Sequence, residues 1–117
     1  MKSDIRVLIV EDDPFLAIDL EDTLEAAGYK VSAVATTVSQ GLSAIEREAP
    51  EIATLDYNLG HETSDAIADE LRQRHIPFCY ITGHMGRLGG ENVPVIDKPV
   101  ASRMVLRTLR DLSRKVN

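Results

Sequence analysis

The stretch Ile52-Ala53-Thr54-Leu55-Asp56-Tyr57-Asn58-Leu59-Gly60 places a short apolar run directly before an acidic residue and a turn. The run is long enough for one buried strand, and Asn and Gly are typical of turns. A rigid sheet can hold a carboxylate at the exit of such a strand and direct it into the mouth of a fold. Aspartate is also common in turns and at helix starts, so this stretch alone leaves both interpretations of Asp56 open.

Apolar runs alternate with helical patterns along the whole chain. Strands are predicted at Arg6–Val10, Tyr29–Ala35, Ile52–Leu55, Phe78–Ile81 and Val93–Ile96, and helices at Pro14–Ala27, Val38–Glu48, Asp65–Arg74 and Ala101–Val116. This alternation predicts an α/β fold with a doubly wound, five-stranded, mostly parallel sheet. The first helix is expected to bury Leu16, Leu20, Leu24 and Ala27, with Asp13 as its N-cap. Four glycines between Gly83 and Asn92 predict a short or disordered fourth helix.

The composition is that of a soluble globular protein, with 117 residues, 44% hydrophobic and 27% charged. We expect one domain over residues 1–117. No apolar run approaches the ~20 residues of a membrane span. The N-terminus lacks the apolar region of a signal peptide, so a cytoplasmic location is expected. The single cysteine, Cys79, lies in an apolar run and is interpreted as a small core residue.

Charge is distributed unevenly, although the net charge of −6 argues against direct binding of nucleic acid. Seven acids and no base lie between Glu11 and Glu25, whereas the last seventeen residues hold five bases and one acid. Arg103, Arg107, Arg110 and Arg114 form one stripe on the last predicted helix. The stripe is interpreted either as a solvated face partly paired with the acidic first helix or as a docking surface for a partner.

Polar residues follow the ends of the predicted strands. They are Glu11 and Asp12 after the first strand, Asp56 after the third, Thr82 after the fourth and Lys98 after the fifth. Ligands of open α/β sheets bind outside the carboxyl ends of the strands, so these side chains should converge. Three carboxylates suit a hard cation such as Mg²⁺ or Mn²⁺, and a lysine with a hydroxyl suits a tetrahedral anion. A carboxylate in this setting can act as a nucleophile toward phosphorus.

The whole chain resembles the receiver domain of two-component response regulators. The matching motifs are Val10-Glu11-Asp12-Asp13, Leu55-Asp56-Tyr57-Asn58-Leu59, Ile81-Thr82-Gly83 and Asp97-Lys98-Pro99. The resemblance implies a flavodoxin-like (CheY-like) sheet of order 2-1-3-4-5. It also implies that Asp56 is the phosphoacceptor, that Glu11, Asp12, Asp56 and the backbone carbonyl of Asn58 hold Mg²⁺, and that Thr82 and Lys98 contact the phosphoryl group. The Lys98–Pro99 peptide bond would be cis.

Two departures point to one subgroup of these receivers. Val95 stands where most receivers carry the aromatic partner of the threonine switch, and the segment between Thr82 and Lys98 is short. Together with Pro77-Phe78-Cys79-Tyr80-Ile81-Thr82-Gly83-His84, these departures resemble the stand-alone "FATGUY" receivers, which typically pair with HWE-type histidine kinases. The expected switch residues are Thr82, Gly83, His84, Met85 and Val95, with His84 or Met85 moving in place of the missing aromatic.

The resemblance implies a single-domain response regulator, phosphorylated by a histidine kinase or histidine phosphotransfer protein and signalling through an unknown downstream protein or by phosphotransfer. It is not expected to be an enzyme. The expected partner surface is Phe15 and Ile18 on the first helix with Arg103 and Arg107 on the last. Two alternatives are a Mg²⁺-dependent phosphohydrolase with an aspartyl nucleophile and a pseudo-receiver that binds partners without being phosphorylated.

Overall fold

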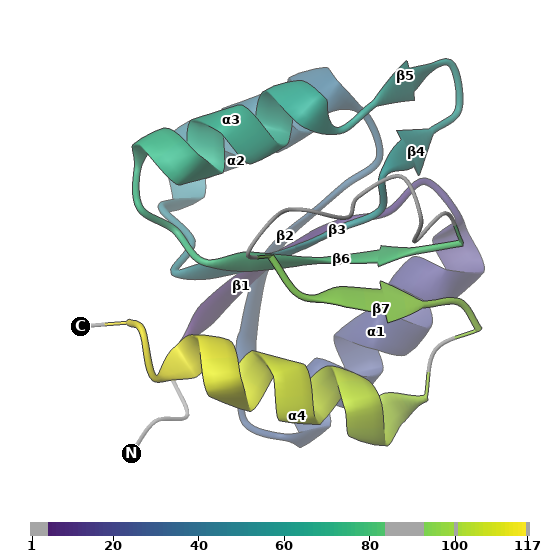
Figure 1. Cartoon of the computed structure of the whole chain (residues 1–117), viewed down its shortest axis with the longest axis vertical. Coiled ribbons are helices and arrows are strands. Elements are labelled where there is room, and N and C mark those ends of the chain that lie inside the picture. The colour runs from purple at the N-terminus through teal and green to yellow at the C-terminus, as the bar shows by residue number, and fades with distance from the viewer. Residues whose placement is uncertain (1–4, 84–92, 100, 117) are drawn as a thin grey trace.

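The computed structural model describes residues 5–83, 93–99 and 101–116. Its strands are β1 (Arg6–Val10), β2 (Lys30–Ala35), β3 (Ile52–Leu55), β4 (Asn58–Leu59), β5 (Glu62–Thr63), β6 (Phe78–Thr82) and β7 (Val95–Asp97). Its helices are α1 (Pro14–Ala26), α2 (Val38–Glu48), α3 (Asp65–Gln73) and α4 (Ser102–Ser113). Its four helices and five of its strands are the predicted elements in the predicted order (Figure 1).

Five strands form one parallel sheet in the order β2-β1-β3-β6-β7. Since β6 and β7 are the fourth and fifth of the predicted strands, the expected order 2-1-3-4-5 is confirmed. Helices α2 and α3 cover one face of the sheet, and α1 and α4 cover the other (Figure 1). The central strands are buried on both faces, which explains why their sequences are continuous apolar runs rather than alternating ones.

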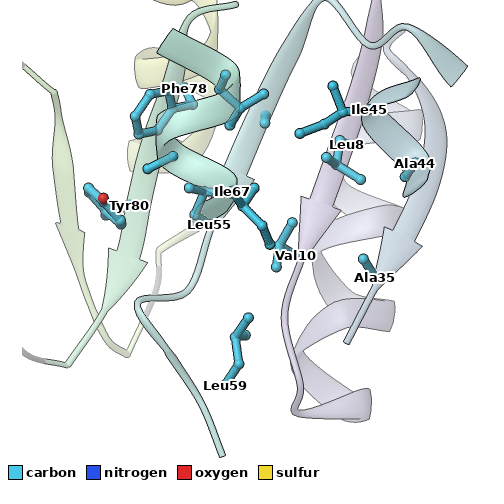
Figure 2. Close-up of a cluster of buried hydrophobic side chains, with 13 residues drawn as sticks. Leu8, Val10, Ala35, Ala44, Ile45, Leu55, Leu59, Ile67, Phe78 and Tyr80 are labelled. Atoms are coloured by element: carbon cyan, nitrogen blue, oxygen red, sulfur yellow. The ribbon is translucent and has the colours of Figure 1, made fainter. Parts of the chain in front are cut away.

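Two hydrophobic cores lie on either side of the sheet. The core under α2 and α3 gathers Leu8, Leu55, Ile45, Ile67 and other side chains around the strands (Figure 2). The core under α1 and α4 includes Val7, Ile9, Leu20, Leu24, Val105 and Leu109. Both cores therefore fasten helices to the same strands, whose ends carry the polar residues identified from the sequence.

Helix α1 begins at a capping aspartate and ends one residue before a predicted core position. The Asp13 side chain accepts hydrogen bonds from the backbone N–H groups of Phe15 and Leu16, which confirms Asp13 as the N-cap. One core prediction for this helix is wrong: Ala27 is exposed, and Ala17 is buried instead. Ala27 lies at the C-cap, one residue past the last helical residue, so it no longer continues the buried face.

A small hairpin after Asp56 was not predicted. Strands β4 and β5 pair antiparallel, with Asn58 opposite Thr63, and Gly60 turns between them at φ 74°. Such a positive φ favours glycine because it lacks a Cβ atom. The Thr63 hydroxyl also donates to Asp65 Oδ2 at 3.1 Å. The hairpin thus joins the end of β3 to the start of α3.

The end of the sheet differs slightly from expectation. Strand β7 covers Val95–Asp97 rather than Val93–Ile96, because pairing with β6 begins at Tyr80 opposite Val95. The segment expected to form a short or disordered fourth helix lies, from His84 to Asn92, outside the described residues. Within the described ranges, no helix combines the length and the apolar character that crossing a bilayer requires.

Cys79 provides a test of this fold. It is fully buried in β6, and burial raises the pKa of its thiol to about 12. At about pH 8, iodoacetamide should therefore alkylate the native protein at least ~100-fold more slowly than the urea-unfolded chain. Mass spectrometry of the two samples over time measures the difference. Equal rates in native buffer and in urea would contradict the burial of Cys79.

Candidate functional site

The carboxyl ends of four neighbouring strands meet at one edge of the sheet. Backbone hydrogen bonds extend the parallel pairing past the strands: Asp56 N–H donates to Val10 C=O at 2.9 Å, and Lys98 N–H donates to Thr82 C=O at 3.1 Å. Glu11 N–H likewise donates to Ala35 C=O at 2.9 Å. The sequence-predicted residues are therefore held by their backbones at the same edge.

Lys98 joins two of the acids directly. Its Nζ lies 2.9 Å from Asp56 Oδ2 and 3.2 Å from Glu11 Oε1. Burial lowers the pKa of Lys98, but the hydrogen bond to Asp56 and the charges of Glu11 and Asp56 outweigh burial and raise that pKa above its ordinary value. The lysine is thus a permanent positive charge beside the Asp56 carboxylate at physiological pH.

The acids differ in how much water reaches them. Glu11 is only 1% exposed and Asp56 is 6% exposed, whereas Asp12 is open to solvent. Burial raises the pKa of Glu11 to about 7, with a further rise from the charge of Asp56. The Asp13 backbone N–H, which donates to Glu11 Oε2 at 3.0 Å, and the Lys98 ammonium act in the opposite direction. The pKa of Glu11 stays raised, so Lys98 and the Asp13 backbone N–H offset only part of the burial of Glu11 and of its repulsion by Asp56.

The donor set fits a hard divalent cation. One carboxylate oxygen from each of Glu11, Asp12 and Asp56 lies within 4.8 Å of the other two. Carboxylate oxygens are the ligands that Mg²⁺ and Mn²⁺ prefer, and the exposed Asp12 leaves a path for entry. A Cβ atom added to Gly60 would lie 4.0 Å from Asp12 Oδ2, so the hairpin that carries Asn58 borders the same site.

The predicted switch residues are only partly described. Thr82 is fully buried at the end of β6, and Gly83 is exposed directly after it. Val95 is half-buried, faces Tyr80 in the sheet register and packs against the core under α2 and α3. His84 and Met85 lie outside the described residues. The Lys98–Pro99 peptide bond is cis, the isomer that the resemblance implies.

The predicted partner surface lies beside the site. Phe15 is 83% exposed and Ile18 is 57% exposed, and Arg103 and Arg107 are exposed on α4. A groove along α1 is lined by Phe15, Ile18, Asp19 and Asp22 with Lys98 and Pro99. Met104, 47% exposed on α4, is a further apolar side chain of this face that the sequence reasoning did not single out. Its position directly after Arg103, at the start of the last helix, is the feature of the sequence that could have indicated its exposure.

Comparison with known proteins agrees with this geometry. The family model for the response regulator receiver domain matches residues 7–88. Among curated proteins, the phyllosphere-induced regulator PhyR of Methylorubrum extorquens is 36% identical over 90 residues, which cover 74% of this chain and 34% of PhyR. The chain therefore spans about a third of that relative's length. The match to the Thermotoga maritima chemotaxis protein CheY covers 45% of that protein.

Two solved structures match almost the whole chain. SdrG from Sphingomonas melonis Fr1 is 34% identical, with a TM-score of 0.81 over 96% of this chain and 98% of SdrG. The PhyR receiver domain of Erythrobacter litoralis gives a TM-score of 0.88 over 97% of this chain and 93% of that domain. Its identity of 24% shows likeness of fold alone.

The raised pKa of Glu11 predicts how stability depends on pH in metal-free buffer. Between its ordinary value of 4.5 and about 7, Glu11 keeps a proton in the folded protein that the unfolded chain has released. The free energy of unfolding should therefore fall as pH rises through this range. Glu11→Gln removes the titration and should be ~1–2 kcal/mol more stable than wild type near pH 8, with the gain shrinking toward acid pH.

Urea unfolding in EDTA across this pH range measures the difference. Glu46→Gln, on the exposed side of α2, is the matched control and should follow the wild-type pH profile. Parallel profiles for wild type and Glu11→Gln would show that Glu11 does not titrate in this way.

Proposed function

Because the chain belongs to the response regulator receiver family, we propose that Asp56 accepts a phosphoryl group from a histidine kinase or a histidine phosphotransfer protein. The observation that carries this proposal is the placement of Asp56 Oδ2, 2.9 Å from the Lys98 ammonium and within the cluster formed with Glu11 and Asp12. A single-domain regulator of this kind would signal by binding another protein or by passing the phosphoryl group on.

The proposed transfer forms one bond and breaks one bond. A carboxylate oxygen of Asp56 attacks phosphorus while the bond between phosphorus and the donor's imidazole nitrogen breaks, and that nitrogen keeps the electron pair. Lys98 is close enough to pair with the phosphoryl oxygens once they occupy the site. Thr82, at the end of the neighbouring strand, would donate its hydroxyl to the same group. Both residues would stabilise the negative charge of the phosphoryl oxygens, and neither would transfer a proton.

A divalent cation, Mg²⁺ or Mn²⁺, would be held by Glu11, Asp12, Asp56 and the backbone carbonyl of Asn58. Bound there, it would neutralise phosphoryl oxygens as charge develops. The Glu11 oxygens already accept hydrogen bonds from Lys98 and from the Asp13 backbone. Asp12 is exposed and forms no hydrogen bond or ion pair with the described residues, so we assign it as the more direct ligand.

The partner would dock over α1 and α4, beside the phosphoacceptor. Phe15 and Ile18 offer apolar side chains that no other described element covers, and Arg103 and Arg107 add positive charge. The resemblance to the subgroup described above favours a kinase of the HWE type, and a cytoplasmic location would give access to it. PhyR of Bartonella quintana is described as an anti-anti-sigma factor, but the match covers 51% of that chain, so its activity is not assigned to this one.

Phosphorylation predicts a mass change that depends on one residue. Incubation with acetyl phosphate and Mg²⁺ should add one phosphoryl group to wild type, and Asp56→Asn or excess EDTA should abolish the addition. Intact-mass spectrometry measures the adduct. An unmodified wild type would favour the pseudo-receiver alternative. Sustained turnover of a generic phosphomonoester would favour the phosphohydrolase.

Partner docking predicts a second, separable effect. Phe15→Asp should slow phosphotransfer from the cognate kinase at least ~10-fold, because it removes a buried apolar contact of the complex. Val34→Asp, at an exposed apolar position on the edge strand β2, is the control and should transfer at the wild-type rate. Radiolabelled transfer from the phosphorylated kinase measures both rates. Equal rates for Phe15→Asp and wild type would place the docking surface elsewhere.

A further inference from the structure

Helices α1 and α4 present opposite charges on the same side of the molecule. They lie on one face of the sheet, where both contribute to one core (Figure 1). The exposed side of α1 carries Asp19, Asp22 and Glu25. The exposed side of α4 carries Arg103, Arg107 and Arg110, and Arg114 continues the stripe at the C-cap.

These charges are not paired with each other within the chain. The interpretation that the arginine stripe is partly paired with the acidic first helix is wrong for the part of the chain that the structure describes. There, Arg103, Arg107 and Arg110 form no ion pair, and Arg114 contacts only Asp111 of its own helix. The α1 acids at positions 19, 22 and 25 likewise have no basic partner among the described residues. The orientation of the two helices explains why their charges do not pair. Each helix buries its apolar side against the sheet, and its charged side chains point outward rather than toward the other helix.

Apolar side chains accompany the charges at one end of this face. Phe15 and Ile18 lie in the first half of α1, and Met104 lies in the first turn of α4. Both helices follow a strand of the parallel sheet, so both begin at the same edge and run in the same direction. Along α1, an apolar part near the site is therefore followed by an acidic part, whereas on α4 Met104 lies beside Arg103 at the start of the arginine stripe.

We propose that a second copy of this chain covers this face, with α1 of each copy against α4 of the other. A twofold axis parallel to the two helices and between them produces this arrangement, because it exchanges their positions and keeps their direction. Phe15 and Ile18 then meet Met104 of the partner near the site, and Asp19, Asp22 and Glu25 meet the partner's arginine stripe. The contact closes on itself, as expected of a symmetric dimer.

The dimer would cover the surface proposed above for kinase docking, so self-association and partner binding would exclude each other. The dimer itself does not rest on phosphorylation, and its test needs neither kinase nor phosphodonor. Failure of one proposal is therefore distinguishable from failure of the other.

Charge reversal tests the arrangement by sedimentation velocity. Wild type should dimerise, whereas Arg107→Glu/Arg110→Glu and Asp19→Arg/Asp22→Arg should each weaken self-association at least ~10-fold, because like charges would face each other. An equal mixture of the two variants should form a 1:1 heterodimer, in which acidic helices again face basic ones. A single chain that carries all four reversals should dimerise like wild type.

The matched control is Arg47→Glu/Arg74→Glu, which changes the net charge as much as the α4 variant but on α2 and at the C-cap of α3. It should dimerise like wild type. A wild type that stays monomeric at ~1 mM would overturn the proposal, since even a weak dimer would be populated there. So would reversal variants that dimerise like wild type, or a mixture that does not re-associate.

Discussion

The ammonium group of Lys98 lies between the carboxylates of Glu11 and Asp56, both of which the fold has almost removed from water. Two ionised carboxylates at such burial repel each other strongly unless a positive charge is close. Lys98 directly follows β7, at one side of the sheet, whereas Glu11 and Asp56 directly follow β1 and β3, which pair with each other. The remaining negative charge is what makes the site suitable for a cation, because one ammonium does not neutralise three acids.

The same parallel sheet explains why the fold was readable from the sequence. Strands buried on both faces must be apolar throughout, so a polar residue marks the point where such a strand ends. The runs Arg6–Val10 and Phe78–Ile81 therefore predicted both the strands and the end of the sheet at which Glu11 and Thr82 lie. The strand order itself came from the family resemblance, since alternation of strands and helices is compatible with several orders.

Structural features that depend on a few local contacts could not be predicted from the sequence. The strands β4 and β5 have two residues each, too few for any periodicity, so the Asn58–Gly60 turn could not be extended into a hairpin. The charged stripes of α1 and α4 could be predicted from the sequence. Whether the two stripes face each other could not, because complementary charges in a sequence do not determine how two neighbouring helices are rotated about their axes. Nor could the sequence show that Glu11 is the most buried acid of the site, which sets its raised pKa.

The position of β7 has a consequence for biosynthesis. Glu11 and Lys98 contact each other across 87 positions of the chain, and β7 joins the sheet only through β6. A ribosome therefore synthesises both acids and four of the five strands of the parallel sheet before the lysine that offsets their repulsion. The emerging chain would carry α1, the proposed docking helix, and Asp56, the proposed phosphoacceptor, before the site around Asp56 is complete. Incomplete chains would thus compete poorly for the phosphoryl group. The chain would become able to accept it only when β7 pairs with β6 and brings Lys98 to the site.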